Sequence, residues 1–216
     1  MRKNIFGGKT AGMCIVIAVL LAAVLSGACS GAPRVNRISA DTRIDLSGYW
    51  NDVDVRIVCE SLINDCLNSP RVADFIRQYS AQHNGRLPAC LVGTFRNESS
   101  EHIDTAIITI TMESTIVNSG KLDFVSGGDT RAEIRSERQD QQTYASEETA
   151  SALGYETGAA LLLTGSVKSI VDRAGNRTIR SYFVDAQLTN IENNTRLWMG
   201  TNNEIKKDIR QPNARF

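Results

Sequence analysis

The chain has 216 residues, of which 42% are hydrophobic and 22% are charged, with 24 basic and 24 acidic side chains. This size fits one domain plus a leader, with enough apolar residues for a core. The balanced charge leaves no basic footprint of a nucleic-acid-binding protein. Only two histidines are present and the five cysteines lack paired metal-ligand spacing, which argues against a zinc site and predicts no cofactor.

The N-terminus has the pattern of an export signal. A positive flank precedes an apolar stretch over residues 11–25, which is shorter than a bilayer span of about 20 residues. Small residues then lead directly to Cys29. This arrangement resembles the lipobox of bacterial lipoproteins, although Ser26 stands where leucine is usual. We expect residues 1–28 to be a signal peptide and Cys29 to carry the lipid; an uncleaved anchor helix or a soluble export signal remain as alternatives.

Residues 29–47 are expected to form a lipidated tether. The segment from Ser30 to Ser47 has no periodicity, and its 18 residues reach at most about 60 Å at ~3.3 Å per residue. Ser30, directly after the lipid-attachment position, weakly favours the outer membrane, with the inner membrane as the alternative. The signal holds three of the 24 basic residues, so the remainder has 21 basic and 24 acidic residues, a net charge of −3.

Two helical segments open the globular part. Apolar residues recur at helical spacing from Val53 to Leu67, with Asn51 or Asp52 as the N-cap and Pro70 as the stop. A shorter helical piece follows over residues 72–80, and residues 83–86 form a turn.

The central region alternates between the two element types. Residues 87–95 predict a buried strand, and caps at Ser99 and Ser100 predict a helix that ends at Gly120. Residues 108–112 also alternate as a strand does, but length and caps favour the helix. We expect a strand at 122–125, then helices at 130–139 and 146–155.

The C-terminal third reads as an antiparallel meander. Strands are predicted at 159–171, 178–188 and 196–200, with a hairpin loop at 172–177 and a polar exit from Lys206 onward. Because the helices come first in the chain and the antiparallel meander comes last, we predict an α+β fold in which helices pack on a sheet. Residues 48–216 are expected to form this fold as a single domain.

The remaining cysteines are expected to be structural. Cys59 and Cys66 lie seven positions apart on one predicted helix, about 10.5 Å along its axis, which exceeds disulfide reach. Three buried thiols are therefore favoured, with a disulfide from Cys90 to one of the others as the alternative.

Other motifs favour structure over catalysis. The Gly127–Gly128 turn lacks the lysine of a phosphate-binding loop, and Glu147 and Glu148 suit the first turn of a helix. We therefore predict that the protein is not an enzyme.

Two arginine sets are candidate partner-binding residues. One set recurs on the 130–139 helix, and the other surrounds the predicted hairpin loop. Either set forms a basic face for a partner or an ordinary solvated surface. The candidates are Arg131, Arg135, Arg173, Arg177 and Arg180, with Arg138 extending the first set.

From Gly48 onward the chain resembles the LpoB family, outer-membrane lipoproteins that activate bifunctional penicillin-binding proteins. The similar segments follow in the family's order and span most of the domain. They are residues 50–52 with 65–67, Val92–Thr105, Val117–Lys121 with 124–125, 156–159 with 163–166, and Ile191–Thr195 with Trp198 and 204–207.

The resemblance implies a fold like the N-terminal domain of TolB, with a central mixed sheet flanked by helices. It implies that the chain docks on a class A penicillin-binding protein, a bifunctional glycosyltransferase and transpeptidase, and regulates peptidoglycan synthesis. It also implies a lipid anchor in the outer membrane with the domain facing the periplasm. The tether of the enterobacterial family member is long and Pro-rich, whereas the tether expected here is short. Three explanations follow from the shorter reach: the periplasm is narrow, the anchor lies in the inner membrane, or the partner is a different protein.

Two other functions remain open at the level of sequence. Related folds occur in lipoproteins of curli-type secretion pores, and residues 103–117 are the weak candidate for a strand that inserts into the membrane. An enzyme or small-ligand sensor is the third hypothesis, without a motif to support it.

Overall fold

The computed structural model describes residues 36–39, 42, 44–154 and 156–211. The predicted signal peptide and Cys29 lie outside these residues. The chain divides into a unit over Met1–Thr42 and a compact unit over Arg43–Phe216, which contains all the elements described below. In the first unit, the Thr42 amide donates a hydrogen bond to the Ser39 carbonyl at 3.1 Å.

Two consecutive helices begin the compact unit. Helix α2 (Asp52–Asn68) starts with a capping box, in which Asn51 and Asp54 exchange side-chain and backbone hydrogen bonds. Its stop coincides with Pro70, which is the first residue of α3 (Pro70–Gln82). The two helices confirm the predicted helical segments, with α3 two residues longer at each end.

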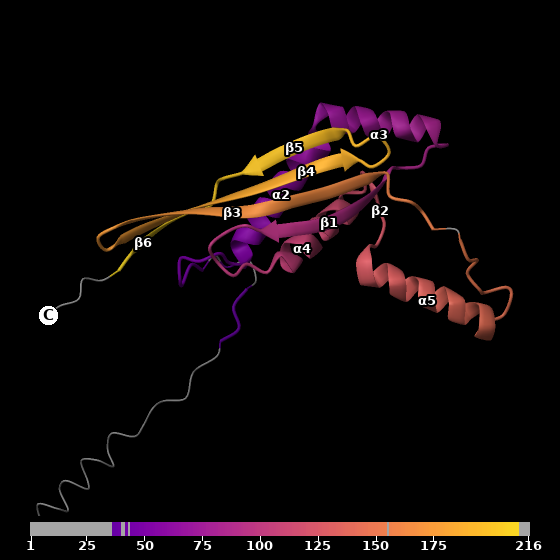
Figure 1. The fold of residues 1–216 in the computed structure, drawn as a ribbon, viewed down its shortest axis with the longest axis horizontal. Helices are drawn as coiled ribbons and strands as arrows, with labels where there is room; N and C mark the ends of the chain where they lie inside the picture. The colour runs from indigo at the N-terminus through magenta and orange to yellow at the C-terminus, as the bar shows by residue number, and fades with distance from the viewer. Residues whose placement is uncertain (1–35, 40–41, 43, 155, 212–216) are drawn as a thin grey trace, which may run out of the picture. The chain divides into compact units, whose positions relative to one another are not determined.

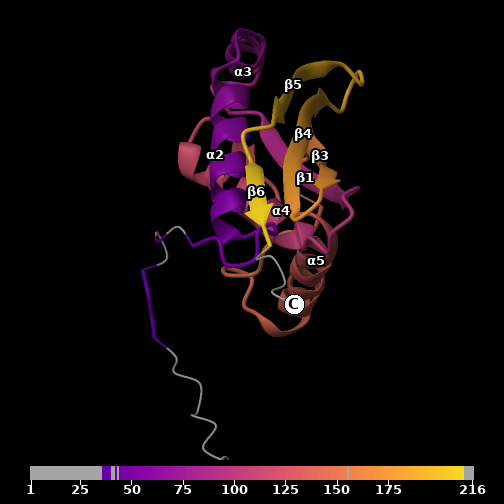
Figure 2. The same cartoon turned by 90° about the vertical axis from the view of Figure 1, so that its left-hand side faces the viewer.

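One mixed sheet forms the rest of the framework, as Figures 1 and 2 show. Its order is β2-β1-β3-β4-β5, and β6 pairs with the first half of β4. The β1 strand pairs in parallel with β2 and β3, whereas the pairs β3–β4, β4–β5 and β4–β6 are antiparallel. The strands are β1 (Ala89–Asn97), β2 (Asp123–Phe124), β3 (Leu161–Ala174), β4 (Arg177–Asn190), β5 (Arg196–Asn202) and β6 (Lys206–Arg210).

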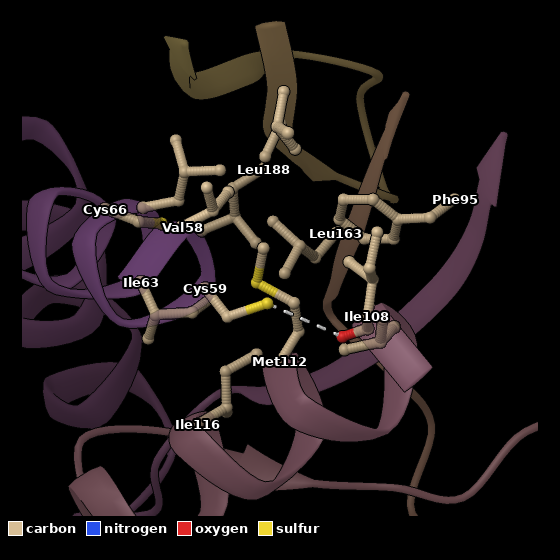
Figure 3. Close-up of a cluster of buried hydrophobic side chains, with 14 of the residues drawn as sticks. Val58, Cys59, Ile63, Cys66, Phe95, Ile108, Met112, Ile116, Leu163 and Leu188 are labelled. Carbon is tan, nitrogen blue, oxygen red and sulfur yellow. Dashed lines mark hydrogen bonds between the residues drawn. The ribbon is translucent and has the colours of Figure 1, made fainter. Parts of the chain in front are cut away.

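The core lies between one face of this sheet and helices α2 and α4 (Thr105–Ser119). Figure 3 shows Val58 and Cys59 of α2 meeting Met112 of α4 beneath Leu163 of β3. The alternating inward residues of β3 and β4 are almost fully buried, as the period of two requires. We call this side the helix-covered face and the other side the open face.

Helix α4 confirms the helical prediction over the competing strand pattern. The predicted caps Ser99 and Ser100 are wrong, because both precede the helix. The N-cap is Asp104, which accepts a hydrogen bond from the Ala106 amide at 3.0 Å, and Gly120 ends the helix at φ 62°. Residues 105–117, within the segment considered for membrane insertion, are thus helical, with Ile108, Met112 and Ile116 buried in the core. In the part of the chain that the structure describes, no helix is long and apolar enough to cross a membrane.

Two predicted segments are wrong. Residues 146–154 form turns rather than a helix. The Ser146 carbonyl accepts hydrogen bonds from the Thr149 and Ala150 amides in a single turn, and Gly154 has a positive φ of 84°. The predicted polar exit after Lys206 contains the strand β6, which pairs with β4 from Arg177 to Ser181. The α5 helix (Gly128–Tyr144) is seven residues longer than its prediction. The predicted single α+β domain with a central mixed sheet is confirmed.

Candidate interaction surfaces

The open face of the sheet carries a groove of about 590 Å³, here the open-face groove. Gly93 lies on its floor under the side chains of Thr164 and Leu162, because a Cβ there would lie 3.0 Å from Thr164 Cγ2 and 3.1 Å from Leu162 Cδ1, which leaves no room for a larger residue. Strands β1, β3, β4 and β5 all contribute to it, since alternate residues of a strand share a face. Its lining includes Gly93, Thr94, Arg96, Leu162, Thr164, Gln187, Arg196 and Met199.

Basic side chains border this groove. Arg96 is 73% exposed and lies 3.4 Å from Glu98, and Arg196 approaches Met199 Sδ at 3.6 Å. The Asp185 carboxylate is already paired with Lys168 and accepts a hydrogen bond from Thr201 at 3.0 Å. Burial alone would raise the pKa of Asp185, but hydrogen bonds from Lys168 and Thr201 outweigh it and the pKa is lowered. The groove therefore offers apolar contacts between two arginines, of which Arg96 forms an exposed ion pair with Glu98.

A second cluster ties the start of the compact unit to the sheet. Residues 44–51, here the entry strap, are held by the buried ammonium of Lys207 on β6. Its Nζ contacts Asp45 Oδ1 at 2.7 Å, Asp54 Oδ2 at 2.6 Å and the Tyr49 carbonyl at 2.8 Å. Burial is the largest influence on Asp54 and raises its pKa despite the Lys207 hydrogen bond. Asp45, in the predicted tether, is thus fastened to the folded unit.

Arg180 belongs to the same end of the sheet. It is 7% exposed, and its guanidinium lies over the Tyr49 ring at 3.8 Å and 3.3 Å from Glu101. The Tyr182 hydroxyl donates to the same carboxylate at 2.8 Å. The guanidinium of Arg180 is therefore occupied inside the fold.

The other hairpin arginines are exposed. Arg173 is the second-last residue of β3, and Arg177 makes two hydrogen bonds to Asp208 of β6 at 2.8 and 2.9 Å. Along β4, Arg177 and Arg180 are separated by three positions and so lie on opposite faces of the sheet. The hairpin set does not form one continuous basic face.

The α5 arginines converge on one carboxylate. Arg135 makes two hydrogen bonds to Glu156 at 2.7 and 3.0 Å, and Arg138 lies 3.4 Å away. Arg131 instead donates to the Ser126 carbonyl at 2.9 Å. The hydrogen bond from Arg135 is the main reason that the pKa of Glu156 is lowered. The role of either arginine set in partner binding stays a prediction.

The three cysteines of the compact unit are free and buried, which confirms the favoured prediction. Burial raises the pKa of Cys59, Cys66 and Cys90 to about 12. The Cys59 thiol lies 3.9 Å from the Ile108 carbonyl, the dashed contact in Figure 3. Such thiols remain protonated at neutral pH and are poor nucleophiles. Within the described ranges, no group of three or more His, Cys, Asp or Glu side chains is placed to hold a metal.

Neither the open-face groove nor the role of Lys207 was predicted from the sequence. A signal for the groove was present, because Leu162 and Thr164 alternate with the buried Leu161 and Leu163 along β3. Lys207 could not be identified, since its three acceptors lie about 160 positions away in the sequence.

Three solved structures illustrate what the chain is similar to. The LpoB C-terminal domain from Escherichia coli is 18% identical, covers 73% of this chain and 99% of its own, and gives a TM-score of 0.43. The NMR structure of E. coli LpoB is 16% identical, covering 85% and 86% of the two chains, with a TM-score of 0.39. Lipoprotein GNA1162 from Neisseria meningitidis is 15% identical, covering 59% and 88%, with a TM-score of 0.35.

A comparison with curated proteins finds no significant match. The family model described as peptidoglycan-synthase activator LpoB matches residues 54–204, which is more than half of the chain and runs from α2 to the segment before β6. The chain therefore belongs to the family of the peptidoglycan-synthase activator LpoB.

Proposed function

We propose that this chain is a lipid-anchored periplasmic protein that binds a class A penicillin-binding protein and activates peptidoglycan synthesis. The observation that carries the proposal is the family match over residues 54–204, which covers every strand of the sheet except β6, all of α4 and most of α2. The anchor is Cys29, in the outer membrane, and residues 1–28 are its signal peptide. Activation requires only that the chain bind the active conformation of the synthase more tightly than the inactive one.

The side chains described above suit binding better than catalysis. The thiols are buried and protonated, and the buried charges at Lys207 and Arg180 are consumed by contacts within the fold. What remains accessible is a groove with apolar and basic lining on the open face. A protein surface with acidic residues around an apolar projection complements it.

We therefore place the docking surface for the synthase at the open-face groove. Met199 is 58% exposed there, and Arg196 stands beside it on β5. An exposed thioether adapts to irregular apolar surfaces, and an arginine at an interface supplies several donors to acidic groups.

The test uses the full-length lipidated protein with a purified class A penicillin-binding protein. Binding and an increased rate of lipid II polymerisation are expected. Met199→Asp should weaken binding at least tenfold, whereas Arg71→Glu on exposed α3 should leave it within twofold. Absence of both binding and activation by the unchanged protein would refute the function, and equal effects of the two variants would refute the surface.

A further inference from the structure

Helix α5 is the one long element of the described chain that lies away from the packed body of the fold. None of its residues is buried, and it does not pack against another described helix or strand. Figures 1 and 2 show it projecting beyond the β1 edge of the sheet. A 17-residue helix without packing gains little stability from its propensity alone.

The topology of the sheet indicates where α5 belongs. The connection β1-α4-β2 runs outward to the edge strand, and the connection β2-α5-β3 runs back past β1. Crossovers between parallel strands are almost always right-handed, so two crossovers in opposite directions place their helices on opposite faces. Because α4 packs on the helix-covered face, the expected position of α5 is over the open face.

The chain enters α5 on that side of β1. A Cβ at Gly127 would lie 2.7 Å from Leu91 Cδ1, and Leu91 shares the open face with Gly93, two positions later in β1. Gly128 follows with a φ of 53°, a conformation that glycine adopts without strain. At the other end, residues 145–154 and 156–160 contain neither helix nor strand, and Gly154 has a φ of 84°. Both ends of α5 therefore have backbone suited to a hinge.

The two sides of α5 differ in their partners. Its arginines point toward Glu156 and Ser126, as described above. Glu133, Glu137 and Asp140 project from the opposite side by helical spacing, and no cation among the described residues forms an ion pair with them. Ile134, 40% exposed, and Tyr144, 86% exposed, border this acidic side. Apart from the hydrogen bond that Gln141 of the same helix donates to Glu137 at 3.0 Å, this acidic side makes no ion pair with the described residues.

We propose that α5 is a lid that swings about its two ends and seats this acidic side on the open-face groove of the same chain. Arg96 and Arg196 on the groove complement Glu133, Glu137 and Asp140, and the apolar side chains of Leu162 and Met199 in the groove pack against Ile134. Closure covers the surface that we assign to the synthase, so the closed lid is autoinhibitory. The inhibitory effect depends on the proposed function, whereas closure itself does not.

Disulfide trapping tests the closure directly. In full-length protein in detergent, Ile134→Cys is combined with Thr164→Cys on the groove floor, or with Ser114→Cys on the exposed side of α4 as the control. The native thiols of the compact unit are buried and do not compete. Under mild oxidation, we expect the 134–164 bridge to form within the monomer at least tenfold faster than the 134–114 bridge.

Charge exchange tests which side of the helix is seated. Adding Arg96→Glu to the 134–164 pair should slow bridge formation at least threefold, and Glu137→Arg should restore the rate. Equal rates for the two cysteine pairs would overturn the lid, as would bridges found only between two molecules. Failure of Glu137→Arg to restore the rate would overturn the seating of the acidic side. These readouts need no synthase, so they stay separate from failure of the proposed function.

Discussion

At the scale of single residues, Lys207 shows how one buried charge is made tolerable. Its ammonium meets two carboxylates and one carbonyl within 2.8 Å, which satisfies all three of its donors. One of those carboxylates, Asp54, is itself 5% exposed and also completes the α2 capping box. Removal of the cation therefore disturbs the entry strap and the start of α2 together.

We predict that Lys207→Met destabilises the fold by about 3–5 kcal/mol, the usual cost of leaving a buried carboxylate unpaired. Protonation of Asp54 would relieve part of this cost, because its pKa is already raised by burial. The neighbouring Lys206→Met, at an exposed position, should change stability by less than about 0.5 kcal/mol. Urea unfolding midpoints of the two variants check the prediction, and equal midpoints would contradict it.

The pair of Lys168 and Asp185 gives a pH-dependent prediction. Because the pKa of Asp185 is lowered in the folded state, its carboxylate stabilises the fold above the unfolded pKa of about 4. That contribution is lost as the pH falls through the lowered pKa. Lys168→Met should raise the Asp185 pKa and make stability less sensitive to acid in this range.

An NMR titration of the Asp185 carboxyl group and unfolding midpoints from pH 3 to 7 measure both effects. Lys121→Met is the matched control, because Lys121 donates to the neutral Asn68 side chain. A pKa of Asp185 unchanged by Lys168→Met would refute the assigned cause.

At the scale of elements, helix α4 shows how a segment with both helical and strand-like patterns becomes a helix. The length of the segment and the stop at Gly120 outweigh the strand-like alternation of Ile108 to Met112, so the helix was predictable, although its N-cap is Asp104 and not Ser99 or Ser100. Two other features, the turns at residues 146–154 and the strand β6, were not predictable from the sequence. Residues 146–154 have a helical start signal but no core to pack against, and β6 looks polar because its pairing partner and the acceptors of Lys207 are distant in sequence. The open-face groove was hidden for the same reason, since four strands build it.

We predict that Met112→Ala lowers the free energy of unfolding by about 2–5 kcal/mol, because the side chain is fully buried between α2 and the sheet. Ile110→Ala on the same helix is the control, and its 63% exposed side chain should cost less than about 0.5 kcal/mol. Thermal and urea unfolding of both variants provide the comparison. Similar losses would show that the outer side of α4 is also packed in solution.

At the scale of the whole molecule, the proposed anchor and the folded unit are separable. We predict that Cys29→Ala leaves the unfolding midpoint of the compact unit unchanged but releases the protein from membranes. Multiple acyl chains bind firmly because each buried methylene contributes about 0.8 kcal/mol. Membrane fractionation with mass spectrometry of the mature N-terminus checks this. An unmodified residue at that terminus in the unchanged protein would contradict the anchor.

The entry strap determines where a mechanical load would reach this domain. A pull transmitted along the polypeptide from a bilayer arrives first at Asp45 and Gly48, which Lys207 and Ile209 of β6 hold. The load therefore passes into the tip of the long β3–β4 hairpin through β6, and into the start of α2 through Asp54. A synthase seated on the sheet would be drawn along with that tip, and the ionic contacts at Lys207 would act as the joint that yields first.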